Sequence, residues 1–313
     1  MKKYYIGVDI GGTSFKIGLV REDGTIFNKM SYLVKNSAKQ EEMIIELAHK
    51  ILDFIKVNEI ALDNIVGVGI GCPGSINSKL GVCDYSNNLK WYDLKIVEIL
   101  KKYINLPIKI TNDANAATLG EYKFGVGKNY QNAIMLTLGT GVGGGVIING
   151  KLYEGNDGKG AELGHSVIKL NGRKCTCGRK GCIEAYASAS ALAKEARSIV
   201  NKHKESSLYL VKDHLTGRII FEHANKGDKV ANIIIDKYCY YLKEAILNYC
   251  NIFRPDLIIL GGGLSAQKEV LLNHIVPCME KEHYGFSNTP KVELKCAELG
   301  NDAGIIGAAS LLM

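Results

Sequence analysis

The sequence contains no long hydrophobic run and no long basic run. No apolar stretch approaches the roughly 20 residues that a membrane-spanning helix needs, and the first residues, MKKYYIGVDIGG, are too short and glycine-rich for the apolar part of a secretory signal. The net charge of +7 comes from 39 basic and 32 acidic residues spread along the chain, whereas a nucleic-acid binder usually clusters its basic residues. We therefore expect a cytoplasmic protein with neither a membrane nor a nucleic acid as partner.

The composition is that of an ordinary globular protein, with 46% hydrophobic and 23% charged residues, which gives no sign of disorder. A length of 313 residues is enough for two domains, each with its own core. Six of the nine cysteines are scattered through mostly apolar surroundings, as expected of small core residues in a reducing compartment. Only Cys175, Cys177 and Cys182 form a group.

Two segments of the chain share one pattern. An apolar strand, a glycine-rich turn with a threonine, a second apolar strand and a polar turn follow one another in residues 4–24, and again in residues 132–151. This weak internal repeat predicts two related α/β domains, each of which offers a glycine-rich loop to one shared cleft. Helical spacing of apolar residues predicts helices over 41–57, 184–204 and 228–252.

The glycine-rich turns are candidate phosphate-binding loops. Glycine allows backbone N–H groups to approach an anion closely, and Asp9, just before Gly11, Gly12 and Thr13, is a candidate Mg²⁺ ligand. In residues 139–145, five of seven are glycine, which would weaken an ordinary strand. Plain hairpin turns are the alternative. Neither the Walker pattern nor GxGxxG fits, because the next segment alternates like a strand.

Asn112 and Asp113 lie between a predicted strand and a predicted helix. Either residue can simply cap the helix. A carboxylate at a domain junction, next to an amide that can orient a hydroxyl group, equally suits a general base.

The segment 164–184 combines one histidine with the three grouped cysteines. His165, Cys175, Cys177 and Cys182 form a Cys₃His set that fits tetrahedral Zn²⁺, although the C-x-C spacing is tighter than the usual C-x₂-C. Four protein donors leave no open position, so the metal would be structural. Free thiols are the alternative. Glu162 and Glu184 lie on either side of the four candidate ligands, and they either bind a polyhydroxyl ligand or are solvated or capping residues.

Several motifs together resemble the ROK family of sugar kinases. They are DIGGTSFK, TNDANAATLGE, LTLGTGVGGGVI, GAELGH, CTCGRKGCIEAYAS and PDLIILGGG, and they cover nearly the whole chain in the expected order. The resemblance implies an α/β, actin-like (hexokinase-type) two-domain ATPase fold, with ATP and sugar in the interdomain cleft. We expect a small domain of residues 1–120 with the C-terminal helix 301–313, and a large domain of residues 121–300 with the zinc-binding loop 165–182.

The resemblance also implies roles for individual residues, with Asp113 as the catalytic base. The implied sugar-binding residues are Pro73, Gly74, Asn88, Asn112, Asp113, Glu162, His165 and Glu184. His165 would use one ring nitrogen for zinc and the other for the sugar. The implied residues for ATP and Mg²⁺ are Asp9, Gly11, Gly12, Thr13, Lys16, Gly139, Thr140, Gly141, Gly261, Gly262 and Gly263.

The implied activity is transfer of the γ-phosphate of ATP to the 6-hydroxyl of a hexose, and glucose is the first candidate for that hexose. The motifs equally resemble N-acetylmannosamine kinases, and fructose and other hexoses stay open. Sugar-responsive repressors of the same family carry a winged helix-turn-helix ahead of the kinase-like part, and the first phosphate motif at Asp9 leaves no room for one. The family further implies a homodimer or homotetramer.

Overall fold

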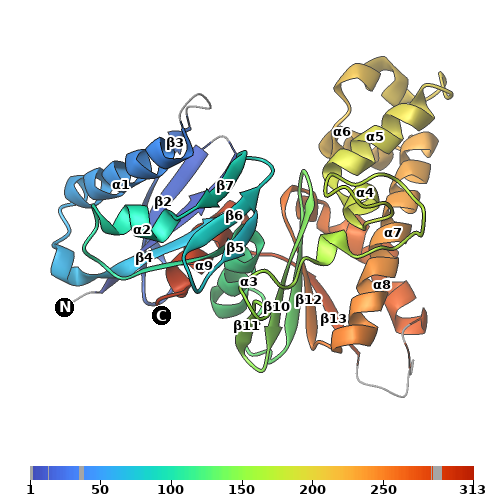
Figure 1. The fold of residues 1–313 in the computed structure, drawn as a ribbon. Helices are drawn as coiled ribbons and strands as arrows, with labels where there is room; N and C mark the ends of the chain where they lie inside the picture. Colours follow the sequence, from blue (N-terminus) through green and yellow to red (C-terminus); the bar gives the residue numbers. More distant parts are fainter. Residues whose placement is uncertain (1–2, 13, 35–38, 283, 285–290) are drawn as a thin grey trace. The chain divides into compact units, whose positions relative to one another are not determined.

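Two five-stranded sheets organise the chain, of which the computed structural model describes residues 3–12, 14–34, 39–282, 284 and 291–313. Their strands are β1 (Tyr4–Ile10), β2 (Ser14–Arg21), β3 (Ile26–Leu33), β4 (Ile65–Cys72) and β8 (Ile108–Asn112), then β9 (Ala133–Leu138), β10 (Val142–Ile148), β11 (Lys151–Tyr153), β12 (Leu257–Gly261) and β13 (Glu293–Cys296). The first sheet has the order β3-β2-β1-β4-β8 and the second β11-β10-β9-β12-β13 (Figure 1). The two orders are the same, as the internal repeat predicts.

The remaining elements surround these sheets. A small sheet contains β5 (Ser75–Asn77), β6 (Val82–Ser86) and β7 (Trp91–Leu94). The described α-helices are α1 (Gln40–Val57), α2 (Ile96–Lys101), α3 (Asp113–Phe124), α4 (Glu184–Ala187), α5 (Ala189–Val200), α6 (Gly217–Asn225), α7 (Lys229–Phe253), α8 (Lys268–Glu282) and α9 (Ala303–Ser310). Among the described residues, none of the helices combines the length and apolar character required to cross a bilayer.

The chain divides into two compact units. Unit 1 contains residues 1–130, 145–161 and 298–313, and unit 2 contains residues 131–144 and 162–297. The C-terminal helix α9 thus belongs to the same unit as the first sheet. The boundaries expected from the sequence, at residues 120 and 300, stay predictions.

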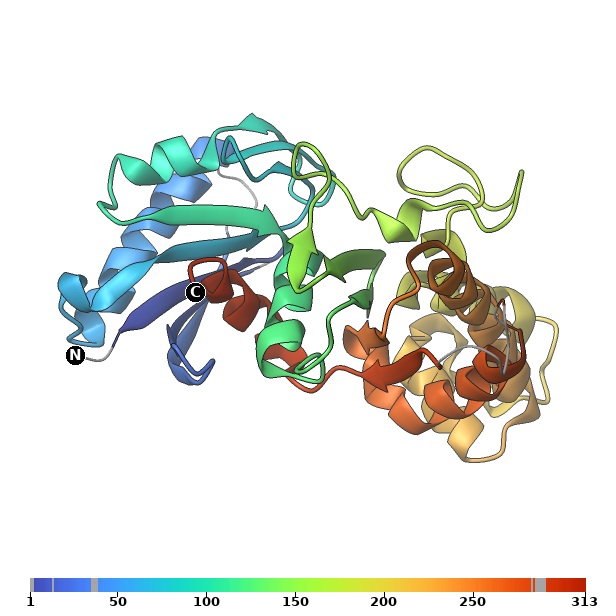
Figure 2. The same cartoon turned by 90° about the horizontal axis from the view of Figure 1, so that it is seen from below.

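The first sheet is covered on both faces. Alternate residues of β1 point to opposite sides, so Ile6 and Val8 pack into a core with α1, whereas Tyr5 packs with Ile305 and Ala309 of α9. Figure 1 shows α1 and α9 on the two sides of this sheet, and Figure 2 shows α9 beside α3. A Cβ atom added to Gly7 would lie 2.0 Å from the carbonyl oxygen of Ile305, so this close approach of α9 requires glycine.

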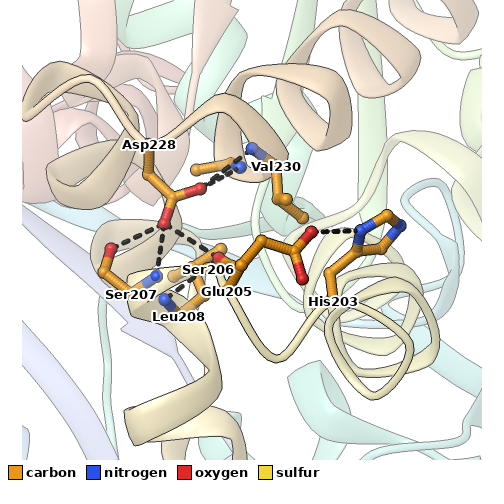
Figure 3. Close-up of polar contacts among 8 residues, drawn as sticks. His203, Glu205, Ser206, Ser207, Leu208, Asp228 and Val230 are labelled. Atoms are coloured by element: carbon orange, nitrogen blue, oxygen red, sulfur yellow. Dashed lines mark hydrogen bonds and ion pairs between the residues drawn. The ribbon is translucent and has the colours of Figure 1, made fainter.

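Three helices of unit 2, α5, α6 and α7, begin at polar side-chain caps. Asp228 caps α7 and accepts hydrogen bonds from the backbone of Val230 and Ala231 through one oxygen, and from Ser206 and Ser207 through the other (Figure 3). The helix predicted over 184–204 is wrong as one element, because Ser188 is extended and caps α5 by accepting from the backbone N–H of Ala191.

Candidate active site and candidate metal centre

Three parallel strands of unit 1 bring several predicted site residues to one edge of the first sheet. β4 lies between β1 and β8 and is parallel to both. In open α/β sheets, ligands bind outside the carboxyl ends of such strands. The segments that leave β1, β4 and β8 carry, respectively, Gly11 and Gly12, then Pro73 and Gly74, and Asn112 with Asp113. Residues about 40 to 100 positions apart in the chain thereby meet at this edge.

Asn112 connects two of these segments. Its side-chain oxygen accepts hydrogen bonds from the backbone N–H groups of Ala114 (2.8 Å) and Asn115 (3.3 Å), so it caps α3. Its amide nitrogen donates to the carbonyl oxygen of Gly74 (3.1 Å). Gly74 has φ of +126°, and an added Cβ would lie 2.3 Å from the carbonyl oxygen of Tyr85. The capping role considered for Asn112 from the sequence is therefore present, and it fixes the turn at Gly74 as well.

Asp113 is the first residue of α3 and is half-buried. One carboxylate oxygen accepts a hydrogen bond from the backbone N–H of Ala114 (3.0 Å). The N-terminal end of a helix stabilises a negatively charged side chain. Asp113 is thus placed, at the strand edge, as a carboxylate that can accept a proton.

The first glycine loop is flanked by an ion pair. Asp9 and Lys16 face each other across β1 and β2, and Lys16 Nζ lies 3.0 Å from a carboxylate oxygen of Asp9. Gly12 is exposed and has open space around its Cα, as an anion-binding backbone requires. Thr13, also predicted for this loop, lies outside the described residues.

Asn88 and Gly12 line the same groove of unit 1, which has a volume of about 870 Å³. Trp91 and Gln40 also line it. Gln40 binds the backbone of Tyr92 reciprocally, donating to its oxygen (2.9 Å) and accepting from its nitrogen (3.0 Å). Two hydrogen bonds therefore connect the start of α1 to β7, next to the turn that carries Asn88.

The predicted glycine loops of unit 2 also lie next to each other. β9 and β12 are parallel neighbours, and Gly139 and Gly262 follow their carboxyl ends. Gly262 has φ of +78°, and an added Cβ would lie 2.7 Å from the backbone nitrogen of Leu138. The described members of the two loops are Gly139, Thr140 and Gly141, and Gly261, Gly262 and Gly263.

Glu184 connects the second glycine loop to the cysteine loop. One carboxylate oxygen accepts from the backbone N–H of Val142 (3.2 Å) and the other from Thr176 Oγ1 (2.6 Å). A Cβ added to Gly141 would lie 2.4 Å from the Glu184 carboxylate. The carboxylate thus has partners within unit 2, where it orders both loops.

Glu162 and His165 lie at the two ends of a short turn that packs on β10. The turn is fixed by Tyr249 of α7, which donates a 2.5 Å hydrogen bond to the carbonyl oxygen of Leu163. The side chain of Glu162 is exposed, yet neighbouring atoms partly desolvate its carboxyl group and raise its pKa; Glu184 adds to this rise and His165 opposes it.

His165, Cys175, Cys177 and Cys182 form a compact cluster, with all four ligand atoms within 4.8 Å of one another. Cys177 Sγ lies 3.7 Å from Cys182 Sγ, and Cys175 Sγ lies 3.6 Å from His165 Nδ1. A tetrahedral Zn²⁺ with Zn–S bonds of about 2.3 Å would place its sulfur ligands about 3.8 Å apart. The cluster therefore has the dimensions and donor types of a structural zinc site.

The protonation of the cluster also bears on metal binding. Burial raises the pKa of the Cys175 thiol to about 12 and also raises that of Cys182. For Cys177, burial acts in the same direction, but hydrogen bonds from Arg179 and the other two cysteines outweigh it and lower the pKa. A metal ion must therefore displace protons from thiols when it binds.

One acidic residue at the first sheet was not among the predicted site residues. Glu154 follows β11, and its carboxylate accepts a hydrogen bond from Thr111 Oγ1 (2.6 Å), two residues before Asp113. Nothing in the local sequence marks Glu154, because its partner is 43 residues away.

The sequence motifs, and their positions in the fold, agree with the family to which the chain is matched. A model of the ROK family matches residues 5–313. The chain belongs to the ROK family. The α/β class and the actin-like ATPase fold expected from the sequence are confirmed by this match and by solved ROK structures.

Relatives in this ROK family include enzymes and regulators. A glucokinase of Thermotoga maritima is 39% identical, over 98% of this chain and 96% of its own. The structure of a ROK family glucokinase from Streptomyces griseus, in complex with glucose and AMPPNP, has a TM-score of 0.84, 32% identity and 98% coverage of both chains. A xylose repressor of Bacillus spizizenii is 31% identical, and the match covers 99% of this chain and 77% of the repressor.

Proposed function

We propose that the protein is an ATP-dependent hexose kinase that transfers the γ-phosphate of ATP to the 6-hydroxyl of glucose. The observation that carries the proposal is the position of Asp113, a half-buried carboxylate at the N-terminus of α3, beyond the end of β8. Relatives that are named glucokinases cover nearly the whole chain and support glucose as the acceptor.

In this proposal, Asp113 accepts the proton of the sugar hydroxyl while the hydroxyl oxygen bonds to the γ-phosphorus. The bond from the γ-phosphorus to the β–γ bridging oxygen breaks, and ADP leaves with that oxygen. Phosphoryl transfer depends mainly on positioning and charge neutralisation. Backbone N–H groups of the two glycine loops and Lys16 contribute positive potential for the phosphates. Asp9 would hold the Mg²⁺ that binds together with ATP, and this ion would neutralise further phosphate charge. The proposed sugar-binding residues are Pro73, Gly74, Asn88, Asn112, Glu162, His165 and Glu184, and Gly261, Gly262 and Gly263 are proposed to lie near the nucleoside.

We propose a structural zinc ion for the Cys₃His cluster. Its four protein donors complete a tetrahedron, so no coordination position is left to activate water. Because Glu184 binds Thr176 inside the cysteine loop, a metal that orders this loop also orders Glu184. The zinc cluster would thereby help to position Glu184, which we assign to sugar binding.

A coupled ADP-release assay tests the proposal with glucose, N-acetylmannosamine, N-acetylglucosamine, mannose and fructose. We expect the highest kcat/KM with glucose. A higher kcat/KM with N-acetylmannosamine would make that sugar the substrate in place of glucose, an alternative that the sequence motifs leave open. Absence of turnover with every sugar, combined with sugar binding in calorimetry, would favour the sugar-sensing role that the xylose repressor relatives suggest. Sedimentation velocity would test the proposed homodimer or homotetramer.

A further inference from the structure

The side chain of Glu154 joins two segments of unit 1 that lie far apart in the chain. One carboxylate oxygen accepts the 2.6 Å hydrogen bond from Thr111 Oγ1, and the other accepts a 3.3 Å bond from Ser78 Oγ. Thr111 is fully buried in β8, where it pairs with Gly71 of β4. A short hydroxyl–carboxylate bond of this kind is among the stronger hydrogen bonds in proteins. Glu154 thus holds β8 close to the residue where α3 begins.

The loop that carries Glu154 is held in place independently of this carboxylate. The backbone N–H of Gly160 donates to the carbonyl oxygen of Glu154 (2.9 Å), which closes the loop. Lys79 Nζ donates to the carbonyl oxygen of Asn156 (2.7 Å), and Lys159 forms an ion pair with Asp84. A change confined to the Glu154 side chain should therefore leave the loop in place and release only Thr111 and Ser78.

We propose that Glu154 is a positioning residue for phosphoryl transfer, which acts on Asp113 through Thr111. The inference rests on the proposed function. Asp113 is separated from Thr111 only by Asn112, whose own side chain is engaged by Gly74 and by the first turn of α3. The start of α3 is thus fixed at two points, Thr111 and Asn112. Misplacement of a catalytic group by about 1 Å can reduce turnover roughly 100-fold.

Variants of the two partners test this role in the full-length protein. We expect Glu154→Ala and Thr111→Val each to lower kcat by roughly 10- to 100-fold, with the KM values for glucose and ATP nearly unchanged. Glu154→Gln and Thr111→Ser retain an acceptor and a donor and should keep most of the activity. Because both single changes break the same bond, the double variant should lose little more than either one.

Ser78→Ala is the matched control, since it removes the weaker contact of Glu154 and leaves Thr111 bound. It should keep kcat within about twofold of the wild type. Wild-type kcat in Glu154→Ala and Thr111→Val, or losses that multiply in the double variant, would overturn the proposal. A loss of kcat that merely follows a loss of folded protein in circular dichroism would overturn it as well.

Amide hydrogen exchange separates this inference from the proposed function. In Glu154→Ala, the backbone amides of residues 112–116 should exchange at least several-fold faster than in the wild type and in Ser78→Ala, because the start of α3 loses one of its anchors. This readout does not need turnover. A wild-type protein inactive with all hexoses would refute the kinase proposal, whereas unchanged exchange in Glu154→Ala would refute the positioning role.

Discussion

The side-chain amide of Asn112 donates a 3.1 Å hydrogen bond to the carbonyl oxygen of Gly74, while its oxygen caps α3. One side chain therefore fixes both the start of the helix that carries Asp113 and the turn that follows β4. The nitrogen and the oxygen of the amide group make different contacts, and substitutions can remove one contact without the other.

Asn112→Ala removes both contacts and should lower the free energy of unfolding by about 1 kcal/mol, the usual cost of a lost N-cap. Asn112→Asp keeps the capping oxygen but cannot donate to Gly74. It should lose some stability, because a carboxylate oxygen then faces the Gly74 carbonyl oxygen, and it should raise the KM for the sugar, because the turn at Gly74 is released. Urea denaturation and steady-state kinetics measure the two effects. Equal KM values in Asn112→Asp and the wild type would contradict the role assigned to the Gly74 contact.

Asp113→Asn should abolish most of the turnover and leave the fold intact. Asparagine cannot accept a proton from the sugar hydroxyl, and loss of general-base catalysis typically costs a factor of about 10² to 10⁴ in kcat. Sugar binding, measured by calorimetry, should persist, and the circular dichroism spectrum should be that of the wild type. Near-normal turnover of the purified variant would refute Asp113 as the base.

Much of this arrangement was visible in the sequence, for local reasons. The glycine loops follow alternating apolar strands, and the expected helices at 41–57 and 228–252 match α1 and α7 within one residue at each end. The break at Ser188 depends on one cap within an otherwise helical pattern, and β5, β6 and β7 are short strands whose pairing is set by tertiary contacts. The contact between Glu154 and Thr111 has no local signal at all, because sheet topology alone brings the two residues together.

Metal analysis tests the zinc site. We expect about one zinc ion per chain, as four donors define one tetrahedral site, and a lower thermal midpoint after treatment with a strong chelator. Cys177→Ser should lose most of the zinc, whereas Cys278→Ser, which changes a half-buried cysteine outside the cluster, should retain it. The proposed structural zinc site would be excluded if purified wild-type protein contained no zinc and chelators did not change its thermal midpoint.

Ala161, which directly precedes Glu162, has φ of +63°, in the left-handed region that disfavours residues with a Cβ. Ala161→Gly should relieve this strain and raise the free energy of unfolding by up to about 1 kcal/mol. The greater conformational entropy of glycine in the unfolded chain opposes part of this gain. Ala161→Val should lower it, because a β-branched residue is disfavoured further. Thermal denaturation of the three proteins measures the order, and a glycine variant that is less stable than the wild type by the full entropy cost of glycine, about 1 kcal/mol, would show that the backbone here is not strained.

Asp228 provides a pH-dependent test of stability in unit 2. Burial acts to raise its pKa, but hydrogen bonds from Ser207, Ala231 and Ser206 outweigh burial and hold the pKa well below the ordinary value of 3.8. Folding therefore favours the ionised form, so its stabilisation is present above pH 3.8 and is lost progressively as the pH falls below that value.

Asp228→Ala should accordingly lower the free energy of unfolding at pH 7 by about 2 kcal/mol, since it removes a helix cap and hydrogen bonds to a charged group. Asp228→Asn keeps an acceptor for the backbone of α7 and should lose less. The difference between the wild type and Asp228→Asn should shrink as the pH falls from 7 to 3, because the Asp228 carboxylate of the unfolded chain, with the ordinary pKa of 3.8, takes up a proton while the folded protein still holds it ionised. Denaturation curves across this range measure it, and a difference that is constant with pH would show that the charge of Asp228 contributes nothing to folding.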